Sequence, residues 1–271
     1  MSSPLHIRPP AVAGMFYPAE ALALEREIRK HLAACDAGAA PAPKALIVPH
    51  AGYIYSGTVA PAAYALLEPL RRIIRRVVLL GPAHRVPVKG LALPVAEAFA
   101  TPLGTLPIDP AARAAAMALP QVSASDLAHN LEHSLEVQLP FLQTVLETFS
   151  IVPFAVGAAT AEEVAQVIDL LWGGTETLIL VSSDLSHFHS YPAAQAIDRR
   201  TVDAILALTP VLEHEQACGA TPINGLLLSA GRRGMAIELL DLRNSGDTAG
   251  DRARVVGYAA FALTEPARVR H

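Results

Sequence analysis

Histidines that adjoin other polar residues are the side chains of this sequence best suited to chemistry. Six of the ten histidines lie in or beside polar segments that follow apolar, strand-like runs: His50, His84, His129, His133, His187 and His189. A single histidine is more often a structural hydrogen-bonding residue than a ligand. Two histidines and a carboxylate, however, make the donor set of a non-haem Fe(II) site with open coordination positions. Imidazole and carboxylate can also hold Zn²⁺ and activate water.

The segment 182–188, SSDLSHF, contains a candidate acid–base pair. Asp184 and His187 are three residues apart and can share a face in a tight turn or a first helical turn. Asp184 would then orient the imidazole and raise its basicity, so that His187 acts as the acid/base. The alternative is that Asp184 only caps the following helix, together with Ser182 and Ser183. The local sequence favours neither interpretation.

Two further segments contain candidate residues. His129 and His133 are four residues apart and can pair on a helix, but the segment lacks the HExxH arrangement of zinc peptidases. The neighbouring Glu132 and Glu136 are interpreted as structural, because acidic side chains favour the N-terminal end of a helix dipole. Asp247 lies in the turn-forming segment NSGDTAGD, and the alternative there is an ordinary surface loop.

Several other chemistries lack support in the sequence. It contains neither a GxGxxG nor a GxxxxGK(S/T) phosphate loop, and no GxSxG nucleophile elbow. Its two cysteines, Cys35 and Cys218, are too few for a disulfide framework or a cysteine-based zinc site. Nothing near Cys218 in the sequence activates it as a nucleophile, so a core or loop role is the better interpretation.

The candidate residues need a scaffold that brings them together. Four short apolar runs, typical of buried strands, each end shortly before one of them: 46–48 before His50, 77–80 before His84, 178–181 before Asp184 and 237–240 before Asp247. If these strands are parallel, their carboxyl ends lie at one edge of the sheet, where open α/β sheets bind ligands. The sequence therefore predicts one polar pocket at that edge.

The order of elements predicts an α/β fold in which strands alternate with helices around a largely parallel sheet. Helices are expected at 19–35, 56–67, 110–118, 161–172, 192–208 and 222–231, strands at 44–48, 76–80, 150–155, 177–181, 236–242 and 255–263, and a hairpin at 91–108. A further helix is expected from about Ser134, because one face carries Leu135, Leu139, Leu142, Leu146 and Phe149. Pro140 predicts that this helix kinks or starts late.

Composition limits the class of protein. With 52% hydrophobic residues, 17% charged residues and a formal net charge of −4, the chain has material for a large core but no concentrated basic surface for nucleic acid. No apolar run approaches 18 residues, and no secretory signal precedes the first strand, so no membrane association is expected. We expect a soluble, cytoplasmic protein that forms a single domain over residues 1–271.

Several motifs together resemble the Memo-like family, also called AmmeMemoRadiSam system protein B. They span nearly the whole chain in family order: AVAGMFYP at 11–18, PHAGYIYSG at 49–57, LGPAH at 80–84, EHSLE at 132–136, SSDLSHF at 182–188, CGATPI at 218–223 and VGYA at 256–259. The resemblance implies one domain with a central parallel or mixed sheet flanked by helices, similar to class III extradiol dioxygenases of the LigB type.

The resemblance also implies roles for individual residues. His50 and His84 match the metal histidines, His187 matches the acid/base position, and His133 would line the same pocket. Animal Memo has a cysteine at the third ligand position, whereas this chain offers Asp247, which favours a carboxylate-type iron site over a thiolate-type copper site. The implied cofactor is a divalent metal, Fe(II) first, with copper and zinc as alternatives.

Three functions remain open at this stage. The first is a metal-dependent oxidoreductase or dioxygenase acting on a small molecule, with the pocket at the strand ends. The second is a pocket-bearing binding or adaptor protein without catalysis, as the peptide-binding role of animal Memo implies, and the third is a metal-dependent hydrolase. The family's system name implies partners of the radical SAM and AMMECR1 types. Family membership alone does not decide among the three.

Overall fold

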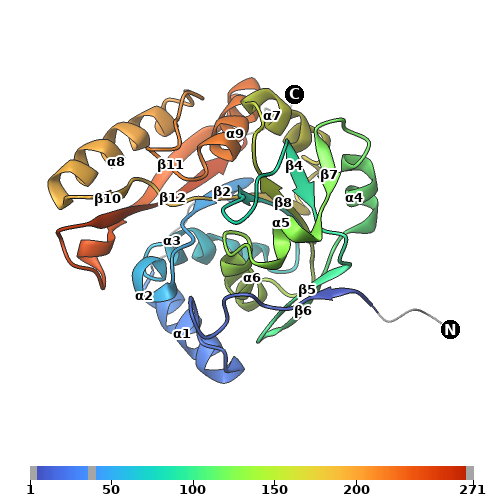
Figure 1. Ribbon diagram of the computed structural model, residues 1–271, viewed down its shortest axis with the longest axis horizontal. Coiled ribbons are helices and arrows are strands. Elements are labelled where there is room, and N and C mark those ends of the chain that lie inside the picture. The colour runs from blue at the N-terminus through green and yellow to red at the C-terminus, as the bar shows by residue number, and fades with distance from the viewer. Residues whose placement is uncertain (1–4, 36–40, 267–271) are drawn as a thin grey trace.

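The computed structural model describes residues 5–35 and 41–266, which are arranged around a large central sheet (Figure 1). This nine-stranded sheet has the strand order β10-β12-β2-β9-β3-β8-β4-β7, and β11 also pairs with β12. Its strands are β2 (Ala45–Val48), β3 (Arg76–Pro82), β4 (Leu91–Leu93), β7 (Val122–Ala124), β8 (Ser150–Val156), β9 (Thr177–Ser182), β10 (His187–His189), β11 (Ala236–Asn244) and β12 (Val255–Thr264). A small second sheet contains β1 (Ile7–Arg8), β5 (Ala98–Thr101) and β6 (Gly104–Pro107).

Four strands in the middle of the large sheet run parallel: β2, β9, β3 and β8. β12 and β4 flank them in antiparallel orientation. The four parallel strands are almost entirely buried, as their continuous apolar runs predict for parallel strands covered on both faces. The predicted α/β fold, with a largely parallel but mixed sheet flanked by helices, is confirmed.

The α-helices cover both faces of this sheet. They are α1 (Ala21–Ala33), α2 (Tyr53–Ser56), α3 (Pro61–Tyr64), α4 (Pro110–Ala116), α5 (Asp126–Asn130), α6 (Leu139–Val145), α7 (Ala161–Leu170), α8 (Tyr191–Leu206) and α9 (Ala220–Arg232). Within the described residues three short 3₁₀ helices accompany them: η1 (Ala65–Leu70), η2 (Glu136–Gln138) and η3 (Ser245–Asp247). None of the helices in the described ranges is both long and apolar enough to span a membrane.

Alternating side chains of the strands build two separate cores. Leu46 and Val48 of β2 belong to a core shared with α1, α3 and α6, whereas Ala45 and Ile47 belong to a core shared with α7, α8 and α9. Figure 1 shows these two groups of helices on opposite sides of the sheet. Because both faces are covered, polar side chains from the parallel strands collect at the strand ends, and that is where the candidate residues lie.

The predicted hairpin and the predicted helix at 56–67 are divided differently in the structure. Only 98–107 of the predicted hairpin forms one, as β5 and β6 around Gly104, while β4 joins the large sheet. Gly104 has a φ of 124°, which an L side chain rarely adopts, and this places the turn there. The predicted helix at 56–67 is divided into α2, α3 and η1, because Pro61 has no amide proton to continue a helix and instead begins α3.

The predicted apolar face after Ser134 is correct, although the helix is shorter. All five of its residues are at most 6% exposed: Leu135, Leu139, Leu142, Leu146 and Phe149. Regular α-helix begins only at Leu139, with Pro140 in its first turn, and ends at Val145. Pro140 therefore delays the helix start, and Leu146 and Phe149 are buried from the extended chain that leads to β8.

Replacing Leu142 with alanine is expected to lower the free energy of unfolding by about 2–5 kcal/mol. Leu142 is a residue of α6 whose side chain is completely buried in the core. Its truncation therefore leaves a cavity as well as losing apolar contacts. Urea denaturation followed by circular dichroism measures the loss. Leu22→Ala serves as the control, because Leu22 is 69% exposed and its truncation should change stability little. Equal stability of the two variants would contradict the assignment of Leu142 to the core.

Candidate metal centre

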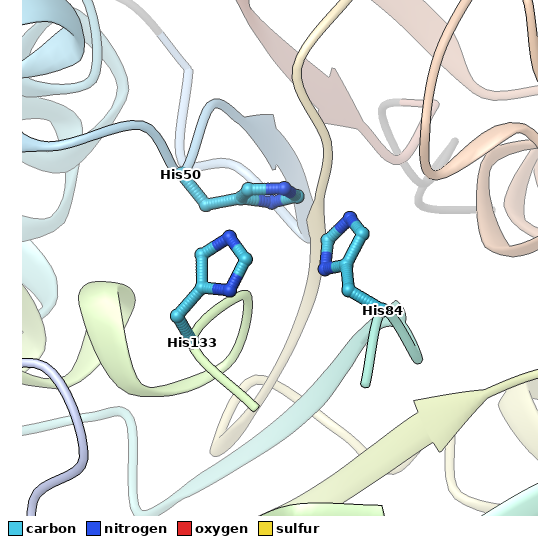
Figure 2. Close-up of side chains that lie close together, drawn as sticks. All are labelled: His50, His84 and His133. Atoms are coloured by element: carbon cyan, nitrogen blue, oxygen red, sulfur yellow. The ribbon is translucent and has the colours of Figure 1, made fainter. Parts of the chain in front are cut away.

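Three histidines from separate parts of the chain face one another at the ends of the parallel strands (Figure 2). His50 lies two residues after β2, His84 two residues after β3, and His133 in the loop between α5 and η2. Each offers one nitrogen that lies within 4.8 Å of those of the other two, and no further group of this kind occurs among the described residues. Their ring centroids are 4.8–5.4 Å apart.

A chain of buried hydrogen bonds sets the tautomer of His50. The Ser182 hydroxyl donates its one proton to the Ser134 carbonyl at 2.6 Å. The same oxygen accepts from Gln138 Nε2 at 2.7 Å, and it must therefore also accept from His50 Nδ1 at 2.9 Å. Tyr64 donates to Gln138 Oε1 at 2.6 Å and so fixes the amide orientation. His50 thus carries its proton on Nδ1 and has its lone pair on Nε2, 3.4 Å from the Cys218 sulfur, and an Nε2 lone pair suits a metal ligand.

Glu132 plays the corresponding part for His84. Its carboxylate accepts from the backbone N–H of His84 at 2.5 Å and from His84 Nδ1 at 2.9 Å. It also accepts from the backbone N–H groups of His133 and Ser134. Burial alone would raise the pKa of Glu132, but these hydrogen bonds outweigh it and lower the pKa to about 2. Ionised Glu132 therefore holds the proton of His84 on Nδ1 and leaves Nε2 free.

The third imidazole, His133, has a buried nitrogen without a partner. Its Nδ1 makes no hydrogen bond within the described part of the chain and lies 3.5 Å from Glu132 Oε1. Burial lowers the pKa of His133 to about 4, against the opposing charge of Glu132. Burial also lowers the pKa of His50, with further contributions from His133 and His84. Neutral imidazoles are the form that binds metals, so this donor set fits a divalent cation.

A cavity of about 570 Å³ adjoins the histidines. His133, Asp184 and His187 line it, together with the loop that joins β11 to β12. A cavity of about 580 Å³ beside β4 and β7 has a similar volume, but none of the candidate residues lines it. The space beside the histidines is thus the one in which a bound molecule would meet them.

Comparison with known proteins agrees with this architecture and extends the resemblance seen in the motifs. A family model described as Memo-like protein matches residues 8–262. The chain belongs to the Memo-like family. A MEMO1 family protein of Methanosarcina acetivorans is 38% identical, and the alignment covers 95% of this chain and 99% of that protein. A MEMO1 family protein of Aquifex aeolicus is 34% identical, with 94% and 98% covered.

A solved structure shares the fold of this Memo-like protein. It is that of the uncharacterized protein JW3007 from Escherichia coli K12, with a TM-score of 0.56. The match covers 80% of this chain and 98% of that one at 13% sequence identity. At this identity the likeness supports the fold and carries no statement about activity.

Asp247 lies outside the histidine group of this Memo-like protein, although it was the predicted third ligand. Its carboxylate accepts from the backbone N–H of Asn244 at 3.1 Å, where it caps η3, and from the Tyr191 hydroxyl. β12 is inserted between β11 and β2, and the end of β11, Asn244, pairs with Gly257, beyond the part of β12 that pairs with β2. His133, which was expected only to line the pocket, takes the third place in the group.

Asp184 and His187 both line the cavity, but Asp184 does not hold the imidazole as predicted. The Asp184 carboxylate accepts from the backbone N–H of His50 at 2.7 Å and so ties the end of β9 to that of β2. Burial raises the pKa of Asp184. His187 Nδ1 instead lies 2.8 Å from the Leu185 carbonyl, which can only accept. His187 thus has its proton on Nδ1, and Nε2 remains available as a base.

The structure also differs from the predictions for His129, Cys218 and Glu132. His129 lies at the end of α5, where Nε2 bonds to the Ala92 carbonyl, so it does not pair with His133. Cys218 was predicted to have a core or loop role, yet its sulfur lies 3.4 Å from His50 Nε2. Burial raises the pKa of Cys218 to about 12, so it is a neutral thiol beside the histidine. Glu132, interpreted as a helix-dipole residue, supports two of the histidines.

Replacing Glu132 with glutamine is expected to weaken binding of a divalent metal by about 10–100-fold. The amide loses the charge that holds His84 in its tautomer, and its N–H₂ group would oppose the backbone donors that now meet the carboxylate. Titration of the metal-free protein with Zn²⁺ against a competing chelator measures the change. Glu163→Gln, in the capping box of α7, is the matched control and should bind Zn²⁺ like the wild type. If the two variants bound Zn²⁺ with equal affinity, Glu132 would not have this supporting role.

Proposed function

We propose that this Memo-like protein is a metal-dependent enzyme that acts on a small molecule, and that its reaction is an oxidation of the non-haem iron type. The observation that carries the proposal is the group of three imidazoles, of which two have their Nδ1 protons engaged by buried acceptors. His50, His84 and His133 would hold the metal. Iron bound there would supply open coordination positions for substrate and oxygen.

The chain supplies the remaining parts of the chemistry around this group. The cavity of about 570 Å³ has the volume of a small-molecule site. His187 lines the cavity with Nε2 free, so it can take a proton from a bound substrate and later return it. Its Nδ1 bond to the Leu185 carbonyl keeps the ring in this tautomer through the cycle. Asp184 ties together the two strand ends that carry the site, and His187 is the acid/base.

Replacing His187 with alanine is expected to lower turnover by about 10²–10⁴-fold while metal content and fold stay at wild-type levels. The variant removes the acid/base, which typically contributes 10²–10⁴-fold to a rate, but none of the three grouped histidines. Substrate screening on the wild type, followed by kinetics and metal analysis of the variant, measures both effects. His189→Ala on the same strand is the control and should remain active. Loss of metal in His187→Ala would assign that residue to the metal instead.

A second candidate function is metal-dependent hydrolysis. Three histidines without a carboxylate are the donor set of zinc sites that activate water, as in carbonic anhydrase. The position of Asp247 outside the group favours this candidate over what the motifs alone suggested. The same cavity and the same His187 would serve a hydrolase, with water as the co-substrate.

Metal analysis of anaerobically purified protein tests these alternatives. Stoichiometric iron supports the oxidoreductase, and stoichiometric zinc supports the hydrolase. Absence of metal after loading with Fe(II), Zn²⁺ and copper would overturn both and leave a binding or adaptor protein. The measurement should be repeated on protein from iron-rich and zinc-rich cultures, because metal availability in the host affects occupancy.

A further inference from the structure

The peptide group between Leu185 and Ser186 links the acid/base to a distant part of the chain. Its C=O accepts from His187 Nδ1 at 2.8 Å, and its N–H donates to Asp198 Oδ1 at 3.0 Å. A trans peptide group is planar, with its C=O and N–H pointing in opposite directions. Asp198 therefore fixes the orientation of the same plane from which His187 takes its hydrogen bond.

Asp198 reaches this peptide group from α8, which packs against β10 and β12 (Figure 1). Asp198 is only 2% exposed. A Cβ added to Gly257 would collide with the Asp198 carboxylate, so the carboxylate lies directly against the backbone of β12. Packing on this side thus leaves the carboxylate little freedom to turn away from the Ser186 N–H.

The two neighbouring peptide groups are held independently of Asp198. The Leu185 N–H donates to the Gly257 carbonyl at 2.8 Å, and the Gly257 N–H donates to the Ser186 carbonyl at 2.8 Å. A change at Asp198 leaves both of these hydrogen bonds in place. Asp198 variants should therefore keep the path of the backbone here and lose only the hold on the one peptide group.

A carboxylate offers more at this position than an amide would. The Ser186 N–H needs only an oxygen acceptor, which an asparagine side chain also has, and a buried carboxylate costs more to desolvate. Burial raises the pKa of Asp198, although hydrogen bonding from Ser186 and the nearby His189 and His187 oppose this. What the carboxylate adds is negative charge at one end of a hydrogen-bonded chain that ends at His187. Hydrogen bonds in such a chain polarise one another, so the charge strengthens the bond from the protonated ring to the Leu185 carbonyl.

We propose that Asp198 is a positioning residue for His187 and acts on it through the peptide group between Leu185 and Ser186. When His187 takes a proton on Nε2, this chain stabilises the positive ring and keeps its orientation, as a buried aspartate bonded directly to a catalytic histidine does. Because Asp198 acts through His187, this role rests on the proposed function. It holds for the oxidoreductase and for the hydrolase, since both use the same acid/base.

Nuclear magnetic resonance of the His187 ring tests the positioning role without a substrate. Protein with ¹⁵N-labelled histidine is loaded with Zn²⁺ and observed at about pH 8.5, where an ordinary imidazole is neutral. The spectrum of His187→Ala identifies the His187 signals. Wild type, Asp198→Asn and Asp198→Ala are compared. Asp203→Asn is the matched control, because Asp203 is an exposed carboxylate on the same helix.

Each variant has its own expected spectrum. In the wild type the proton of His187 should be found on Nδ1. In Asp198→Ala the peptide group is free to turn, so the ring should populate both tautomers. Asp198→Asn should keep the proton on Nδ1 but shift its resonance upfield, because an amide polarises the chain less than a carboxylate does. Asp203→Asn should match the wild type.

A purely structural Asp198 would give a different result. Its variants would lose thermal stability, but the His187 ring signals of the folded protein would not move. Ring signals equal to those of the wild type in both Asp198 variants would therefore overturn the proposal. If Asp198→Ala does not fold, unchanged signals in Asp198→Asn are sufficient to overturn it.

Turnover, once a substrate is found, separates this role from the proposed function. Asp198→Asn should lower kcat by about 10–100-fold, the loss typical when the outer partner of a functional imidazole is removed. KM should stay near the wild-type value, because Asp198 does not line the cavity beside the histidines. A wild-type kcat in Asp198→Asn would overturn the contribution of the charge. A wild-type kcat in His187→Ala would instead refute the proposed function, and the ring signals would still decide whether Asp198 positions His187.

Discussion

His50→Ala and His84→Ala variants are expected to lose stoichiometric binding of a divalent metal while the fold persists. Each change removes one of three converging nitrogens, and direct donors should cost more than the 10–100-fold typical of residues that only support a ligand. His84 is exposed, so its truncation leaves the cores intact. Metal content after loading with Fe(II) or Zn²⁺, together with far-ultraviolet circular dichroism, measures the two properties.

Asp247→Ala is the informative comparison for these variants. Its carboxylate caps η3 and bonds to Tyr191, so the variant should retain metal with at most a small loss of stability. Metal loss in Asp247→Ala with retention in His133→Ala would restore the site of two histidines and a carboxylate. Unchanged metal stoichiometry in the His50/His84 double variant would refute the metal centre altogether.

Arg8→Ala is expected to lower the free energy of unfolding by about 3–5 kcal/mol. Arg8 and Glu136 form a buried ion pair at 2.6 Å, with side chains 2% and 0% exposed. The variant leaves the Glu136 charge buried with only backbone amides and the Tyr17 hydroxyl to satisfy it. Urea denaturation at neutral pH measures the loss.

An exposed ion pair provides the control for Arg8→Ala. Arg29 and Glu25 lie at the same kind of distance, 2.7 Å, but on the surface of α1 with side chains 63% and 41% exposed. Arg29→Ala should cost only about 0.3–0.5 kcal/mol, because water solvates the carboxylate that remains. If both variants lost stability equally, burial of the Arg8–Glu136 pair would not be the source of its effect.

The parallel strands and their polar ends could be predicted because continuous apolar runs are a local signal. His50, His84 and Asp184 each come after a run that forms a buried parallel strand. Their convergence could be predicted because the carboxyl ends of parallel strands lie at one edge of the sheet, where ligands bind. Asp247 follows a similar run, yet β12 separates β11 from β2. Strand order depends on long-range pairing, which periodicity along the chain does not encode.

His133 was predicted to line the pocket, but its place in the histidine group and the support that Glu132 gives could not be predicted, for a related reason. Both lie in a loop between short helices, where no repeat indicates the direction of a side chain. An acidic residue beside a histidine is also the common signature of a helix start, and this favoured the structural interpretation of Glu132. Only the buried position of its carboxylate, with three backbone donors, shows that it serves the histidines.

A metal bound to the three histidines would link metal supply to the lifetime of the protein, because these residues are far apart along the chain. Residues 50, 84 and 133 meet only when β2 and β3 are assembled, so the unfolded chain offers no comparable chelate. A cation bound there would therefore add its binding free energy to folding, about 2.7 kcal/mol at a hundredfold excess over the dissociation constant. Thermal midpoints would rise with metal concentration, and metal-starved cells would turn the protein over faster.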